Sequence, residues 1–553
     1  MNRVSVFARR QRIKNLEQWT IYAILVEAFF VALSPTVAAA AIMFGVITWF
    51  IRTRIDSRYK FQSLPFDVPV AIFLLVGAIS VMLSSVRSFA LIYNYCMLVG
   101  IYGFTYLIVG QTIRKPEQVK QVFQALGASA IIVVVCGLFQ FAFGVDITDM
   151  KWTDPDAFPE LRKRIFSTLE NPNVLAGYLD IFICLSLGMF SSVENRFHKV
   201  LFGAAIILFA MCLVMTYSRG AFLTIVVIFV VYGIIKDWRI LILFAAVIAF
   251  IAYTDTAFIE RIMSSFNGND SSEGVRVGIW VSTMAMIADH PFAGIGWGAY
   301  QYVYPQYNYY IADNDIIIYH AHNIYLNYAA EIGIVGALAF FWYFFGTMYT
   351  SLKASENPDE GKNALAQYLK NILANSSVSA YLSELMTVVN QKFVDFYDTL
   401  MKLIGKDKVK RKAKVNRRDE NVVHHEEMKW SSPPLALGKK ENKDDEENVT
   451  SVEKIHVAGE NISVKSIKLS VDDYGEDEDT TIADDKAKLI NFGKMLTIKD
   501  KILLDGLRFG IGLAFLSMAL NGFTDDLLFN IQSSILMWQL GALSAAINLM
   551  KGN

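Results

Sequence analysis

The stretch HAHNIYLNYAAEIGIVGALAFFWYFF, residues 320–345, joins a polar loop to a long apolar segment. Two of the seven histidines, His320 and His322, stand at this boundary beside Asn323, and Glu331 follows inside the apolar stretch. Ionisable groups at membrane depth are costly and usually face a cavity or a partner. The stretch therefore predicts a membrane helix preceded by a functional site. In the alternative reading, both histidines simply lie at the level of the lipid headgroups.

The composition indicates a polytopic membrane protein. Hydrophobic residues make up 54% of the 553 residues, charged residues 19%, and the mean hydropathy is +0.36. These values are too apolar for a water-soluble chain of this length. The basic residues form short clusters between apolar runs, so no nucleic-acid partner is expected. All four cysteines lie in apolar stretches without CxxC spacing, which argues against a disulfide framework and a zinc site.

The apolar runs predict an all-α integral membrane protein with about twelve transmembrane helices. Each run approaches the length needed to cross roughly 30 Å of hydrocarbon. The basic N-terminus resembles a secretory signal, but the apolar run continues through Ser34 and Pro35 into a second one, which favours a retained hairpin. The predicted spans are 19–33, 36–51, 66–84, 89–110, 119–143, 173–191, 198–217, 220–235, 239–256, 322–350, 502–520 and 525–549.

The distribution of lysine and arginine predicts the orientation of these spans. Basic clusters follow the second, fourth, sixth and eighth spans, on the same side as the basic N-terminus. By the positive-inside rule that side is cytoplasmic, and both termini lie there. The segment 144–172 and the long loop 255–321 then lie on the opposite, outward face. We expect these two loops to build the working surface.

Residues 351–501 interrupt the membrane pattern. An amphipathic stretch leads into KDKVKRKAKVNRRDE and then into acidic runs such as DDYGEDEDTT, a composition typical of partly disordered chain. Span parity places this insert in the cytoplasm, where it could contact anionic lipid or a cytoplasmic partner that no motif identifies. The predicted organisation is a transmembrane region 1–350, a charged insert 351–501 and C-terminal transmembrane helices 502–553.

Three cationic or titratable residues mark the predicted outward face. Arg219 stands at a tight turn between two spans, Arg276 opens a helical pattern in the long loop, and His322 ends that loop. Arginine grips phosphate oxygens with paired donors, and histidine accepts a proton from a hydroxyl near neutral pH. Together they suit transfer from a lipid-linked diphosphate. Taken singly, Arg219 also fits a snorkelling cap, Arg276 a surface charge and His322 an interfacial hydrogen-bonding group.

The ordered set YSRGAFL, GVRVGIW to HPFAGIGWGAY, and HAHNIYLNYAAEIGIVG resembles the O-antigen ligase and polymerase superfamily of bacterial inner-membrane glycosyltransferases. The resemblance implies a periplasmic active site that moves a glycan from undecaprenyl diphosphate to an acceptor, inverting, without metal or cofactor. It implies that His322 is the catalytic base and that Arg219 and Arg276 bind the donor diphosphate. The insert departs from the family, which usually has a short cytoplasmic loop there.

Further candidates follow from softer matches. The segment RIFSTLENPNVLAGYL resembles the family's outward approach to a membrane helix, which makes Arg164 and Asn173 possible substrate contacts. His320 and Asn323 are possible contacts beside His322. Gly294 and Gly296 in GIGWG are expected to form a turn, because an isolated GxG lacks the strand-to-helix setting of a phosphate cradle.

Several functions use the same residues. The leading hypothesis is an O-antigen ligase that transfers the glycan to lipid A-core. A polymerase would use a second undecaprenyl-linked repeat as acceptor, and a protein O-oligosaccharyltransferase a Ser or Thr. An anion or lipid transporter would bind its substrate with the arginines, although no repeated halves are visible. A scaffold for polysaccharide assembly would leave the outward residues unexplained.

Overall fold

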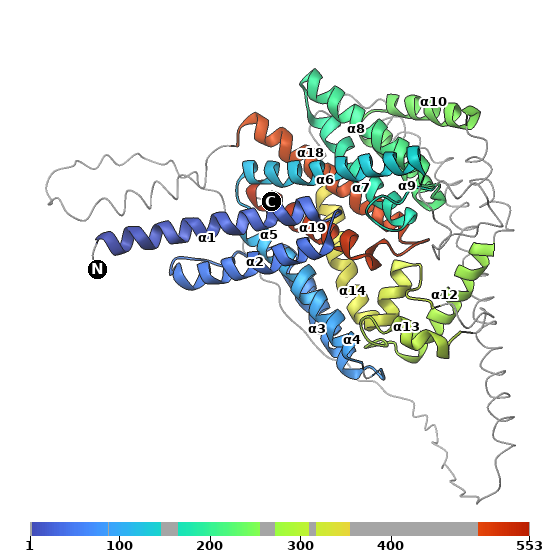
Figure 1. Ribbon diagram of the computed structural model, residues 1–553, viewed down its shortest axis with the longest axis horizontal. Coiled ribbons are helices and arrows are strands. Elements are labelled where there is room, and N and C mark those ends of the chain that lie inside the picture. Colours follow the sequence, from blue (N-terminus) through green and yellow to red (C-terminus); the bar gives the residue numbers. More distant parts are fainter. Residues whose placement is uncertain are drawn as a thin grey trace, which may run out of the picture. The chain divides into compact units, whose positions relative to one another are not determined.

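The computed structural model describes residues 3–86, 88–144, 164–254, 271–308, 317–353 and 496–551. In these ranges every regular element is a helix, and no strand occurs (Figure 1). The central part of the predicted insert lies outside the described residues, as do parts of both predicted outward loops. The all-helical prediction is therefore confirmed for the described chain.

Eight of the described helical segments are long and apolar enough to cross a membrane, judged by length and composition. Two shorter apolar helices, α3 (Asp67–Leu83) and α9 (Arg219–Ile235), occupy two more of the predicted spans. The total of twelve spans stays a prediction. The eight segments are α2 (Pro35–Ile55), Phe89–Thr112 (α4 Phe89–Met97, the π-helix η1 Leu98–Gly103 and α5 Phe104–Thr112), α6 (Pro116–Phe143), α7 (Pro172–Ser192), α8 (Arg196–Met215), α14 (Ile324–Lys353), α18 (Ile498–Asn521) and α19 (Ile531–Lys551).

The two tightest predicted turns are true helix boundaries. Ser34 caps α2 by accepting a hydrogen bond from the Val37 amide, and Pro35 takes the first helical position, where a missing N–H costs nothing. Ser218 is the N-cap residue of α9, so α8 and α9 are separate helices. The remaining elements are α1 (Arg3–Phe30), α10 (Arg239–Thr254), α12 (Ser271–Asp289), α13 (Tyr300–Val303) and the 3₁₀ turns η3 (Tyr304–Gln306) and η4 (Leu527–Phe529).

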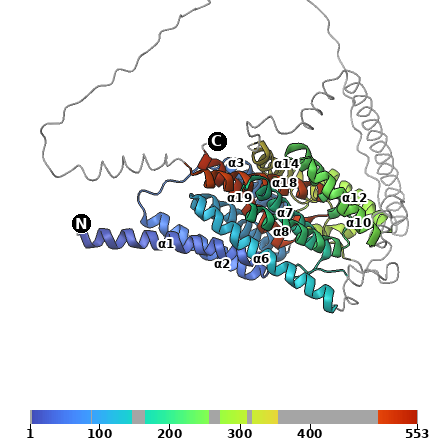
Figure 2. The same cartoon turned by 90° about the horizontal axis from the view of Figure 1, so that it is seen from above.

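Helices α7 and α18 lie side by side in the helical bundle (Figures 1 and 2). Glycines make this close approach feasible: a Cβ on Gly188 would overlap the backbone of Gly506 and Gly510. Small residues at such contacts let two membrane helices pack backbone to backbone. The segment after α18 is thereby brought beside the N-terminal end of α7.

Helix α14 is broken inside the apolar stretch. Gly333 has φ 70° and ψ 173°, so the carbonyls of Ala330 and Glu331 lack their usual partners in the next turn. They instead accept hydrogen bonds from the amides of Ile295 (2.8 Å) and Gly296 (3.0 Å). Backbone groups at membrane depth must be satisfied inside the protein, and the segment 290–298 does this.

Two further hydrogen bonds form at the break, one from the same segment and one from α3. The Ile334 amide donates to the Pro291 carbonyl at 2.8 Å, and the Ser80 hydroxyl of α3 donates to the Glu331 carbonyl at 2.7 Å. Gly294 and Gly296 both have positive φ, as expected for a turn, and a Cβ on Gly294 would lie 2.5 Å from the Glu331 backbone. The turn therefore satisfies the backbone carbonyls that the break in α14 leaves free. The sequence does not indicate this contact between the turn and α14.

Candidate functional site

A pocket forms where the N-terminal ends of α7 and α9 meet the segment after α18. Asn173 and Val174 belong to the first turn of α7, and residues 218–221 cap and begin α9. The pocket has an empty volume of about 820 Å³, including the part open to solvent. Its lining residues are Arg164, Asn173, Val174, Gly177, Tyr217, Ser218, Arg219, Gly220, Ala221, Arg276, Asn521, Thr524, Asp525 and Leu527.

Three arginines from separate segments contribute to this pocket. Arg219 is the first residue of α9, and Arg276 lies in the second turn of α12. Arg164 is buried, and its Nε donates to the Thr216 carbonyl at 2.7 Å while Nη2 donates to Oδ1 of Asn173 at 2.8 Å. The structure thus brings together four of the six residues for which the sequence predicted phosphate or substrate contacts; His320 and Asn323 do not line this pocket.

The pocket has the chemistry of an anion site. The first amides of a helix carry no intrahelical acceptor and the positive end of the helix dipole, so helix N-termini favour anions. Here two such ends, those of α7 and α9, face the same space as three guanidinium groups. Asp525 is the one carboxylate among the lining residues. The excess of positive charge suits a diphosphate, and the volume of the pocket leaves room for a second reactant.

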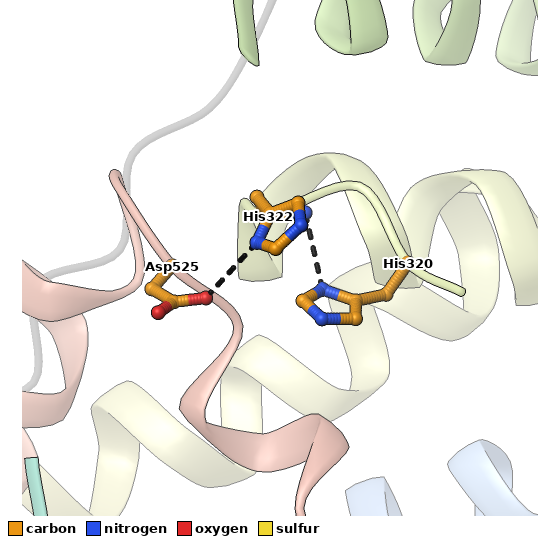
Figure 3. Close-up of side chains that lie close together, drawn as sticks. All are labelled: His320, His322 and Asp525. Carbon is orange, nitrogen blue, oxygen red and sulfur yellow. Dashed lines mark hydrogen bonds and ion pairs between the residues drawn. The ribbon is translucent and has the colours of Figure 1, made fainter. Parts of the chain in front are cut away.

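His322 is linked to the pocket through Asp525. Its Nδ1 lies 3.3 Å from Oδ1 of Asp525, and the two side chains are 35% and 27% exposed (Figure 3). Figure 3 shows His322 between Asp525, on the segment after α18, and His320, on its own loop. A histidine whose Nδ1–H donates to a carboxylate holds its lone pair on Nε2, which is the arrangement of a general base.

His320 supports the backbone of His322. Its Nδ1 accepts a hydrogen bond from the His322 amide at 3.2 Å, and its ring stacks on Phe529 with 4.4 Å between centroids. Burial, followed by the neighbouring His322, lowers the pKa of His320 to about 3 even though Asp525 acts in the opposite direction. A ring that stays neutral near pH 7 can keep accepting this amide hydrogen bond.

Two adjacent aspartates have opposite pKa shifts. Burial acts to raise the pKa of Asp525, but the hydrogen bond and charge of His322, with His320 and Arg276, hold it well below its usual range. Burial and the charge of Asp525 raise the pKa of Asp526 to about 7, against hydrogen bonds from the Phe529 and Leu528 amides. Asp525 is thus the ionised partner of His322, while Asp526 caps η4.

Asn323 joins the histidine loop to the segment after α18. Its Oδ1 accepts the amides of Tyr325 and Leu326, both at 3.0 Å, and thereby caps α14. Its Nδ2 donates to the Phe523 carbonyl at 3.1 Å. These bonds give Asn323 a positioning role for His322 and Asp525; a direct substrate contact by Asn323 stays a prediction.

Backbone conformations with positive φ occur at the site. Among the described residues other than glycine, Tyr217 (φ 52°) and His322 (φ 49°) are two of the four with positive φ. The others are Ser167 and Glu170, in the segment that leads to α7. Such conformations are uncommon for bulky side chains and cost on the order of 1–3 kcal/mol each. Their place beside Arg219 and Asp525 indicates that the fold holds these side chains in required positions.

One donor set could hold a metal ion. Ligand atoms of His320, His322 and Asp525 all lie within 4.8 Å of one another, and imidazole with carboxylate suits first-row transition metals. However, Nδ1 of His320 already accepts the His322 amide, and Nδ1 of His322 faces Asp525. The protein hydrogen bonds therefore compete with a metal for these lone pairs.

Residues 204–341 match the family model described as O-Antigen ligase. The match begins in α8, ends in α14 and includes Arg219, Arg276 and His322 in the order in which the sequence resemblance placed them. This match supports the resemblance of the chain to the O-antigen ligase superfamily. Arg164, Asn173 and Asp525 lie outside the matched stretch. A comparison with curated proteins found no match.

The sequence interpretation missed one residue at the centre of this site. The last predicted membrane span begins at Asp525, but α19 begins at Ile531, and residues 522–530 form a loop with the turn η4. The signal was present: NGFTDDLLFN places two adjacent acids in a short interruption between apolar runs. Span parity places that interruption on the same predicted face as His322.

Proposed function

We propose that this multi-pass membrane protein is an O-antigen ligase-type glycosyltransferase. It moves a glycan from undecaprenyl diphosphate to a hydroxyl group of lipid A-core at the periplasmic face of the bacterial inner membrane. One observation carries the proposal: a single pocket joins three arginines and two helix N-termini to the Asp525–His322 pair. A diphosphate leaving group needs the first part, and an acceptor hydroxyl needs the second.

In the proposed step, Nε2 of His322 takes the proton of the acceptor hydroxyl while its oxygen attacks the anomeric carbon of the donor glycan. The bond between that carbon and the diphosphate oxygen breaks from the opposite side, so the configuration inverts. Arg219 and Arg276, with Arg164, neutralise the departing diphosphate, a contribution that grows as charge develops. The products are the glycosylated acceptor and undecaprenyl diphosphate, and His322 later returns its proton to solvent.

In this proposal the arginines neutralise the diphosphate, a task for which other transferases use a divalent cation. Transfer should therefore proceed unchanged after extraction with EDTA and without added metal. Inhibition by EDTA that Mn²⁺ or Zn²⁺ reverses would instead assign the donor set of His320, His322 and Asp525 to a metal.

The test is reconstitution of the full chain with an undecaprenyl-diphosphate glycan and lipid A-core. We expect His322→Ala to lower transfer by about 10²–10⁴-fold, the usual contribution of a general base. His290→Ala is a matched control, because His290 is exposed at the far end of α12 and lies outside the pocket. Undiminished transfer by His322→Ala would remove the base from the mechanism.

For the arginines we expect a kinetic result that differs from that of His322→Ala. Arg219→Ala and Arg276→Ala each remove a charge-assisted phosphate contact worth about 1.5–3 kcal/mol, which corresponds to donor use weaker by roughly 10–100-fold. Parallel reactions with a second undecaprenyl-linked repeat, or with a Ser- or Thr-containing peptide, decide between ligase, polymerase and protein O-oligosaccharyltransferase. Movement of intact donor across the membrane without any glycosylated product would favour the transporter.

A further inference from the structure

Three buried polar side chains meet just behind the pocket. Asp180 lies on α7, seven residues after Asn173; Thr224 lies on α9, five residues after Arg219; and Asn521 ends α18, four residues before Asp525. At 1.5 Å per residue, Asp180 and Thr224 are about 10 Å and about 8 Å along their helices from the pocket residues. All three side chains are buried, and Asn521 itself lines the pocket.

Asn521 connects the three helices through both ends of its amide. Its Nδ2 donates to Oδ2 of Asp180 at 2.9 Å, and its Oδ1 accepts from the Thr224 hydroxyl at 3.2 Å. Its two partners are complementary, since the carboxylate oxygen accepts and the hydroxyl donates. The amide therefore has one favourable orientation. The distances fix how α7, α9 and α18 stand relative to one another.

The backbone of Asn521 extends this connection to the catalytic side. Its carbonyl accepts hydrogen bonds from the amides of Thr524 (3.0 Å) and Asp525 (2.9 Å). The Thr524 side chain in turn packs against α9, where a Cβ on Gly220 would lie 2.7 Å from its Oγ1. Asn521 thus contacts α9, which carries Arg219, and α7, which carries Asn173. It also contacts the turn that carries Asp525.

Stability alone does not explain an aspartate at position 180. Its second oxygen, Oδ1, is buried and has no hydrogen-bond partner among the described residues. An unpartnered buried polar atom costs free energy of folding, and an ionisable group inside a membrane helix marks a functional position by default. A leucine would lack this atom but would leave Nδ2 of Asn521 without its acceptor, so the polar side chain at position 180 is best explained by its bond to Asn521.

We propose that Asp180, Thr224 and Asn521 are positioning residues that hold the donor-binding arginine pocket and the His322–Asp525 pair in one productive geometry. The proposal rests on the function proposed above. Displacements of about 1 Å in an active site can lower turnover about 10²-fold, so loss of this cluster should affect catalysis more than folding.

The test uses two pairs of matched variants in the reconstituted full chain. Asp180→Asn and Thr224→Ser keep the acceptor and the hydroxyl, and transfer should stay within about three-fold of the wild type. Asp180→Leu and Thr224→Val remove them, and we expect kcat/KM for the donor to fall at least about ten-fold, the effect of one lost buried hydrogen bond. Because Asp180→Leu also leaves Nδ2 of Asn521 without its acceptor, the melting temperature of each variant is measured alongside transfer.

The donor KM separates positioning from folding. A variant that only lowers the folded fraction lowers the apparent kcat and leaves KM unchanged, whereas a displaced Arg219 raises KM. Equal KM values in all four variants, or wild-type transfer by both Asp180→Leu and Thr224→Val, would overturn the positioning role. If Asp180→Leu does not fold, the isosteric Thr224→Val decides. Arg219→Ala is measured alongside: if it too transfers normally, the proposed function fails instead.

Discussion

Asp525 contacts both parts of the site. It lines the arginine pocket, and its carboxylate lies 3.3 Å from Nδ1 of His322. A negative charge in the proposed diphosphate pocket would oppose donor binding. Its presence is therefore best explained by its effect on His322, which it orients and whose protonated form it stabilises during transfer.

This role predicts a separation of kinetic constants for Asp525→Asn. We expect kcat to fall by about 10²-fold or more, because the amide stabilises the protonated ring less and permits the wrong tautomer. The donor KM should stay equal or fall, since a charge that repels phosphate is removed. Steady-state transfer at varied donor concentration measures both constants. Asp289→Asn, at an exposed position outside the pocket, is the control, and an unchanged kcat would contradict the role.

The neighbouring Asp526 predicts a pH dependence of stability. Its pKa is about 7 in the folded protein, against about 3.9 for an unperturbed aspartate. Between these values the folded state binds more protons than the unfolded state. The contribution of Asp526 to the free energy of unfolding is therefore fully present below pH 4 and is lost as the pH rises through 7.

Asp526→Asn removes this titration and can still accept the Phe529 amide hydrogen bond at Oδ1. The melting temperature of the variant minus that of the wild type should thus increase steadily from pH 4 to pH 8. Thermal unfolding in detergent at several pH values measures the difference, and Asp237→Asn, at an exposed position, is the control. A pH-independent difference would show that Asp526 ionises normally.

At the scale of elements, two helix starts and one helix break build the site. The first turns of α7 and α9 line the pocket, and the capped start of α14 holds His322 beside the segment after α18. The break at Gly333 fixes the loop between α12 and α13 against α14. The helices thus act as rigid supports whose ends carry the chemistry.

The break predicts a strong effect for Gly333→Ala. The residue has φ 70°, and an added Cβ would overlap the Phe292 carbonyl. The melting temperature should fall by several degrees, or the protein should fail to accumulate. Gly127→Ala in α6 is a matched control, because a Cβ there meets nothing within 4 Å, and a better helix former should be neutral or slightly stabilising. Equal stability of the two variants would mean that the loop is not docked at the break.

The sequence predicted elements better than the contacts between them. Apolar runs located most helices, since length and hydropathy are local properties. The break at Gly333 was not predicted, because one glycine in an apolar run does not reveal which loop satisfies the freed carbonyls. Asn521 and Thr224 were also missed, since isolated polar residues in apolar runs do not indicate their partners.

At the scale of the whole molecule, the site is assembled from distant parts of the chain. His322 and Asp525 are separated by 203 positions, and residues 354–495 between them lie outside the described structure. The order YSRG, GVRVG and HAHN was visible in the sequence because those motifs are contiguous stretches. The role of Asp525 was not visible in the sequence, because helix packing rather than sequence proximity brings it to His322.

The proposed topology predicts opposite membrane sides for the insert and the pocket. In a cysteine-free background, single cysteines at positions 276 and 290 should react with a membrane-impermeant maleimide from outside the cell. Cysteines at positions 420 and 460 should react only after the membrane is permeabilised. Replacing the natural Cys96, Cys136, Cys184 and Cys212 removes the background. Outside labelling of the insert would contradict both the span parity and the cytoplasmic termini.

The break in α14 also has a consequence for biogenesis. The segment 290–298 leaves the ribosome before α14, and that helix cannot satisfy the carbonyls of Ala330 and Glu331 by itself. Each such group left in hydrocarbon costs several kcal/mol. In the proposed topology, stable insertion of α14 into lipid therefore coincides with docking of a loop on the outward side. A nascent chain whose loop is delayed would present an incomplete helix to the membrane proteases that survey unassembled segments.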